Sequence, residues 1–175
     1  MPDMPREPNW FEKILGIIPG YKGYRAREAG RESDAILRRE IAGKLDKAKL
    51  RLNDAVNELT SAGRLDLLDP IGQLQSLLGR LADTIRLAPR GASGWLDDYA
   101  IDGQVLDRMY EVDLQVAESA VRLVEQVDGI TPGDEAAEQV RAAREAAQSL
   151  EDAFERRREL LSGSAQGTDG PTVME

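Results

Sequence analysis

Residues 36–59, ILRREIAGKLDKAKLRLNDAVNEL, decide the fold class of this chain. Apolar side chains recur in this stretch at spacings of three and four: Ile36/Leu37, Ile41, Leu45, Ala48, Leu52, Val56 and Leu59. This period places them along one side of an α-helix, as in a coiled-coil seam. We therefore predict a long helix over about 25–62, with Gly63 as the left-handed residue that ends it.

Three further helices follow from the same periodicity. We expect them over about 69–88, 102–127 and 131–161, with Asp69, Asp102 and Thr131 as their N-caps. The helix over 69–88 has its apolar positions at Ile71, Leu74, Leu78, Leu81 and Ile85. Clear alternating strand patterns are absent. The prediction is an all-α protein: an elongated antiparallel four-helix bundle with a coiled-coil-like long first helix and a short N-terminal amphipathic helix.

The composition excludes the catalytic and metal-binding sites that depend on Cys or His. The chain has 175 residues, no Cys and no His. It therefore has no thiolate nucleophile and no sulfur-based metal site, and it lacks the usual general base near neutral pH. We expect no cofactor and no metal, and a protein that is not an enzyme. No secretory signal or membrane-spanning stretch is recognisable, so a cytoplasmic location is expected.

The sequence divides into four parts. Residues 1–8 read as a disordered leader, 9–23 as an amphipathic N-terminal element and hinge, 24–161 as the helical bundle, and 162–175 as a disordered tail. The first bundle helix is about twice as long as the second in this prediction. Part of it must project, bend or pair with another chain, which favours a homo-oligomer, a dimer first, or a helical partner protein.

The first candidate site is the N-terminal amphipathic element. Its apolar residues share one side of a helix that Asn9 can cap, and cations follow it: Trp10, Phe11, Ile14, Leu15, Ile17 and Ile18, then Lys22, Arg25 and Arg27. Helices that lie in an anionic membrane surface combine these features. The alternatives are that this face packs on its own bundle or a second copy, or that it docks another protein.

Three weaker candidates lie elsewhere. The acidic residues between Asp97 and Glu118 could hold a divalent cation, but a solvated helix face is the simpler interpretation. Trp95 and Tyr99 follow a Gly-rich loop, where they would either stack on a ligand or close the end of the bundle. A basic stretch around Lys44 to Arg51 is interrupted by acids in an acidic chain of net charge −9, so no nucleic-acid partner is expected.

Residues 9–62, an amphipathic element that feeds a long helix, resemble in layout the membrane-stress scaffolds of the phage-shock type. The resemblance is one of layout only and no residue role is carried over from it, because Pro19-Gly20 and the shorter later helices depart from a plain coiled-coil scaffold. Three functions stay open: a non-enzymatic interaction or scaffold protein peripheral to the membrane through this element, a soluble oligomeric adaptor that docks a protein through it, and a carboxylate-based metal binder or enzyme.

Overall fold

The computed structural model describes residues 9–25, 27–89 and 103–166. Their regular structure consists of α1 (Trp10–Ile17), α2 (Arg27–Ser61), the 3₁₀ turn η1 (Leu65–Leu67), α3 (Leu68–Leu87), α5 (Gly103–Asp128) and α6 (Ala136–Gln166). The prediction of an all-α helical bundle is confirmed. The expected leader over 1–8, Trp95 and Tyr99 lie outside the described residues. The last helix continues five residues past the expected Leu161.

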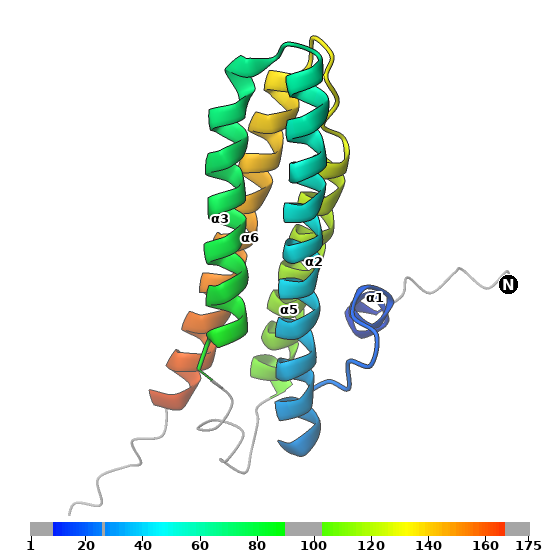
Figure 1. Cartoon of the computed structure of the whole chain (residues 1–175). Coiled ribbons are helices and arrows are strands. Elements are labelled where there is room, and N and C mark those ends of the chain that lie inside the picture. The colour runs from blue at the N-terminus through cyan, green and yellow to red at the C-terminus, as the bar shows by residue number, and fades with distance from the viewer. Residues whose placement is uncertain (1–8, 26, 90–102, 167–175) are drawn as a thin grey trace, which may run out of the picture.

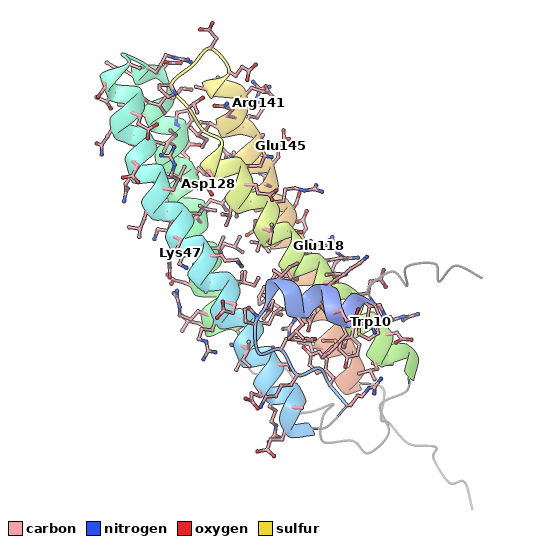
Figure 2. All side chains as sticks on the ribbon, turned by 90° about the vertical axis from the view of Figure 1, so that its right-hand side faces the viewer. Trp10, Lys47, Glu118, Asp128, Arg141 and Glu145 are labelled. Atoms are coloured by element: carbon pink, nitrogen blue, oxygen red, sulfur yellow. The ribbon has the colours of Figure 1, made fainter. Side chains whose placement is uncertain are left out.

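Four long helices form the bundle, and α1 lies outside it (Figure 1). The hairpin of α2 and α3 packs on the hairpin of α5 and α6, through α2 against α5 and α3 against α6. Each hairpin is antiparallel, whereas α2 runs parallel to α5 and α3 runs parallel to α6 (Figure 1). Helix α1 packs against α5 and crosses the direction of the bundle (Figures 1 and 2).

The predicted apolar positions make up the core. All five positions predicted for 69–88 are buried, and so are Leu37, Ile41, Leu45, Leu52 and Leu59 of α2. Helix α6 buries mainly alanines, which let α5 and α3 approach closely, with Leu150 and Phe154 adding bulk. Because α2 buries its seam inside its own chain, the seam leaves no exposed apolar stripe for a coiled coil, and the dimer stays a prediction.

Helix ends were predicted less well than helix faces. Gly63 ends α2 at φ +75°, and Arg64 N–H donates to Leu59 O at 2.8 Å, which completes a Schellman motif. Asp69 is not an N-cap, because η1 leads straight into α3 one residue earlier. Thr131 is not one either: α6 begins at Ala136, and the Thr131 N–H donates to the Gln139 side chain at 2.9 Å.

The extra length of α2 is covered by the N-terminal segment and α6. Ser33 and Asp34, near the start of α2, are buried. Ser33 Oγ donates to Gly23 O at 3.1 Å and accepts from Lys22 N–H at 2.9 Å. Asp34 pairs with Arg157 of α6. The first turns of α2 therefore belong to the folded unit.

Candidate functional site

Helix α1 uses its apolar face to cover α5. Asn9 caps it as predicted, because its Oδ1 accepts from Glu12 N–H at 3.0 Å. Ile14 and Ile18 are fully buried, and Trp10, Phe11 and Ile17 are half-buried against the core. In this structure the protein's own bundle occupies the predicted face except at Leu15, which was expected on that face and is exposed.

Tyr110 of α5 is the centre of this contact. The Trp10 ring stacks on it with a centroid distance of 3.9 Å, and Phe11 meets it edge-on at 6.1 Å. Tyr110 Oη also accepts from Tyr24 N–H at 3.0 Å. Gly23 lies directly beneath: a Cβ there would be 2.4 Å from that hydroxyl, and its φ of +74° independently favours glycine.

Two tyrosines tie the segment after α1 to a buried carboxylate. Tyr21 and Tyr24 each donate a hydroxyl proton to Asp113 Oδ2 at 2.6 Å, and Arg157 Nε donates to Asp113 Oδ1 at 2.7 Å. All four side chains are at most 2% exposed. We call this group of four the tyrosine anchor.

The tyrosine anchor continues into a buried network that reaches every bundle helix. Arg157 Nη2 donates to Tyr24 Oη at 3.1 Å and pairs with Asp34 Oδ1 of α2 at 2.8 Å. Asp34 in turn binds Arg38, whose Nη1 donates to the carbonyl of Arg86, in α3, and to that of Ala88, just beyond it. Such a network favours a single arrangement of the helices, provided that every polar group in it keeps its hydrogen-bond partner.

Burial and charge set the protonation states of this group. Burial, followed by the nearby Asp113 charge, raises the pKa of Tyr21 and of Tyr24 well above the ordinary value. Burial opposes the charge of Arg157, but its attraction to Asp113 and Asp34 outweighs this, so the pKa of Arg157 lies well above its ordinary value. The phenols therefore act as proton donors and Arg157 stays a cation across the physiological range.

The outward side of the segment carries cations. Lys13, Lys22 and Arg25 are exposed, and Lys22 forms an exposed ion pair with Glu32 at 2.8 Å. Leu15, on the same short helix, is 42% exposed. The side chain of Arg27, the last predicted cation, lies outside the described residues.

The acidic residues between Asp97 and Glu118 differ in their exposure to solvent. Asp107, Glu111 and Glu118 are exposed, as a solvated face predicts, and Figure 2 shows Glu118 on the outside of the bundle. Asp113 departs from that interpretation, because it is fully buried in the tyrosine anchor. Within the described parts of the chain, no three acidic side chains are placed to hold a metal ion. Asp97, Asp98 and Asp102 fall outside those parts.

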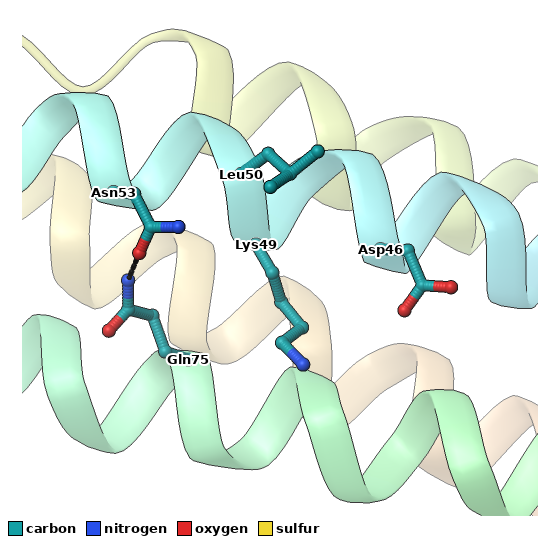
Figure 3. A pocket seen from close by; sticks show the side chains of 5 residues that line it. All are labelled: Asp46, Lys49, Leu50, Asn53 and Gln75. Atoms are coloured by element: carbon teal, nitrogen blue, oxygen red, sulfur yellow. Dashed lines mark hydrogen bonds between the residues drawn. The ribbon is translucent and has the colours of Figure 1, made fainter.

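An open groove of about 440 Å³ runs between α2 and α3 (Figure 3). Its lining is Asp46, Lys49, Leu50, Asn53 and Gln75. Its polar groups are largely engaged: Asn53 Oδ1 accepts from Gln75 at 2.7 Å, and Asp46 pairs with Arg86. Leu50 is 65% exposed. Apart from Lys49, the ionisable side chain of the lining is Asp46, which is held by Arg86, so the groove gives no basis for a catalytic proposal.

The sequence interpretation missed the tyrosine anchor, although a signal was present. Asp113 continues the spacing of Met109, Val116 and Ala120, and Arg157 continues that of Phe154 and Leu161. A charged residue at a core position of a helix predicts a buried partner. Within the run Arg156-Arg157-Arg158, Arg158 pairs with Glu155, which is near in sequence, whereas Arg157 pairs with Asp113 of another helix.

Comparison with protein families, with curated proteins and with solved structures finds no match to this chain. Helices that are both long and apolar enough to cross a bilayer are absent from the described residues.

Proposed function

We propose that the protein is a non-enzymatic helical interaction protein that attaches to an anionic membrane surface through α1 and the cations that follow it. The observation that supports this most is the position of α1. It is the short amphipathic helix outside the four-helix bundle, and its apolar face makes a contact that a lipid surface can replace.

Movement of α1 from the bundle to a membrane would replace one apolar contact by another. Trp10, Phe11 and Ile14 bury apolar surface against α5 in the structure, and they would bury similar surface at the headgroup boundary of a bilayer. Lys13, Lys22 and Arg25 would then favour the membrane by about 1 kcal/mol each on anionic lipid. The proposal therefore requires anionic lipid and predicts weaker binding in high salt.

A soluble adaptor is the second candidate function. One observation favours it: α1 already packs as a helix on a helical protein surface, with Trp10 against Tyr110. An amphipathic helix of this kind can enter an apolar groove of another protein in the same manner. The two functions differ in their response to lipid.

Co-sedimentation with vesicles tests the membrane proposal. The full chain is compared with Leu15→Asp and with Leu50→Asp, which place the same charge at an exposed leucine on α1 or on α2. We expect the full chain and Leu50→Asp to sediment with vesicles rich in phosphatidylserine but not with phosphatidylcholine alone, and Leu15→Asp to remain in solution. Absence of binding by the full chain, or equal binding by both variants, contradicts the proposal.

A further inference from the structure

We propose that α1 opens as a lid about Pro19–Gly20 while residues 21–24 remain fixed to the bundle by the tyrosine anchor. This inference rests on the proposed function and adds its regulation. In the closed form the bundle covers the face of α1 that would enter the lipid. The protein therefore binds a membrane through this face only after α1 has opened.

The contacts that hold α1 are apolar and aromatic. They consist of the stack of Trp10 on Tyr110, the edge contact of Phe11, and the burial of Ile14 and Ile18. The burial of apolar surface has no directional requirement, so another apolar surface can replace this part of the contact. A helix of eight residues is marginal in water by itself, and an open lid is therefore stabilised by a surface that receives it.

The contacts that hold residues 21–24 are polar, directional and buried. Tyr21 and Tyr24 donate to Asp113, and the backbone N–H groups of Lys22 and Tyr24 donate to Ser33 and Tyr110. Lifting this segment would remove two donors from a buried carboxylate, which a lipid surface does not replace. Local opening should therefore stop before Tyr21.

The residues between these two parts suit a hinge. Pro19 and Gly20 are exposed, and Gly20 has φ +84°. A Cβ at Gly20 would meet only the tip of Ile36, at 3.8 Å, so the surroundings leave room for a change of backbone angle. Hinges are commonly a few residues at the end of an element, as here at the end of α1.

Single cysteines can separate the lid from the anchored segment, because the chain has no cysteine of its own. Ile14→Cys places a thiol beneath α1, and Ser33→Cys places a thiol beneath residues 21–24. The second substitution weakens the hydrogen bonds of Ser33 to Lys22 N–H and Gly23 O, so it biases the comparison toward faster reaction at position 33, against the expected result. Leu45→Cys, in the middle of α2, reports opening of the bundle. All three positions are fully buried. The readout is the rate of reaction with a water-soluble disulfide reagent under native conditions, without lipid.

We expect Ile14→Cys to react at least about 100-fold faster than Ser33→Cys, because local openings are far more frequent than global ones. Ser33→Cys should react within about tenfold of Leu45→Cys. Equal rates at positions 14 and 33 would overturn the hinge, because the whole segment would then leave together. A rate at position 14 as slow as that at position 45 would overturn the lid.

If a cysteine variant fails to fold, hydrogen exchange on the unsubstituted chain distinguishes opening of α1 alone from opening of the whole N-terminal segment. Backbone amides of residues 14–18 should exchange faster than those of Lys22 and Tyr24, and the reverse order would contradict the inference. Neither measurement contains lipid. A lid that opens in a protein that binds no vesicles would refute the proposed function alone. Vesicle binding by a protein in which, without lipid, position 14 reacts as slowly as position 45 would refute the lid alone.

Discussion

Arg157 of α6 donates from Nε to Oδ1 of Asp113 of α5 at 2.7 Å, and both side chains are buried at one end of an otherwise apolar bundle. The two tyrosines that follow α1 complete the shell of the carboxylate. A buried ion pair adds little net stability compared with apolar residues. The loss of one partner, however, strongly lowers the free energy of unfolding, because it leaves the other charge buried and unpaired. The pair therefore fixes where the N-terminal segment attaches.

Replacement of Arg157 should destabilise the protein much more than replacement of its neighbour. We expect Arg157→Met to lower the free energy of unfolding by about 3 to 5 kcal/mol, because it leaves Asp113 buried without its cation and leaves Asp34 with Arg38 alone. Arg158→Met removes an exposed pair with Glu155 and should change it by less than about 1 kcal/mol. Urea denaturation of the two variants makes the comparison, and equal effects would contradict the network.

The hydroxyl groups of Tyr21 and Tyr24 should each contribute substantially to the free energy of unfolding, although each is a single polar group. We expect Tyr21→Phe to lower the free energy of unfolding by about 1.5 to 3 kcal/mol, the range for a hydrogen bond to a charged group, although the ring and its packing remain. The same measurement on Tyr24→Phe should show at least as large a loss, because Tyr24 also accepts from Arg157. Losses near zero in both variants would mean that Asp113 does not depend on these donors.

The same tyrosines give the stability a dependence on alkaline pH. Their pKa values are raised in the folded state, so above the unfolded value of about 10 the unfolded chain loses protons that the folded chain keeps. Their contribution is complete below pH 10 and is lost as pH rises beyond it, by up to about 2.7 kcal/mol per pH unit for two groups.

Urea unfolding between pH 9 and 11.5 measures this slope. The double variant Tyr21→Phe/Tyr24→Phe is the matched comparison, since all other titrating groups remain in it. A shallower decline in the double variant is the expected result. Parallel curves for the two proteins would show that the phenols ionise as freely in the fold as in the unfolded chain.

Two glycines should respond in opposite directions to alanine. Gly23→Ala should lower the free energy of unfolding by about 1 to 3 kcal/mol from backbone strain alone, because φ is +74°. A clash of the new Cβ with Tyr110 Oη adds to this loss. Gly43→Ala, in the middle of α2 with open space at its Cβ position, should stabilise by about 0.5 to 1 kcal/mol. Thermal unfolding followed by circular dichroism measures both, and a destabilised Gly43→Ala together with a neutral Gly23→Ala would contradict this account.

Periodic features could be predicted from the sequence, and long-range polar contacts could not. Ile71, Leu74, Leu78, Leu81 and Ile85 are buried as expected, because helix periodicity is local. The expected caps at Asp69 and Thr131 were wrong, because a 3₁₀ turn and a turn over 132–135 occupy the helix approaches. Such boundaries depend on how the chain turns at the end of the bundle.

The candidate site shows the same limit. The apolar face from Trp10 to Ile18 could be recognised from spacing, and its packing on the bundle was one of the stated alternatives. What covers it could not be read locally, because Tyr110 lies about one hundred residues away along the chain. The contact of Tyr24 with Arg157 is longer in range still, at 133 residues. Only the charged residues at core positions signalled that a polar contact would form there.

The central claim is that the face of α1 leaves Tyr110 and enters an anionic membrane surface. Trp10 reports this directly, because it stacks on Tyr110 at 3.9 Å in the closed form. In a Trp95→Phe background Trp10 is the single tryptophan of the chain, and its fluorescence is recorded with vesicles whose acyl chains carry bromine. The account predicts quenching by anionic brominated vesicles, reversed by salt, and none by neutral ones. Unquenched Trp10 on anionic vesicles that do bind the protein would contradict it.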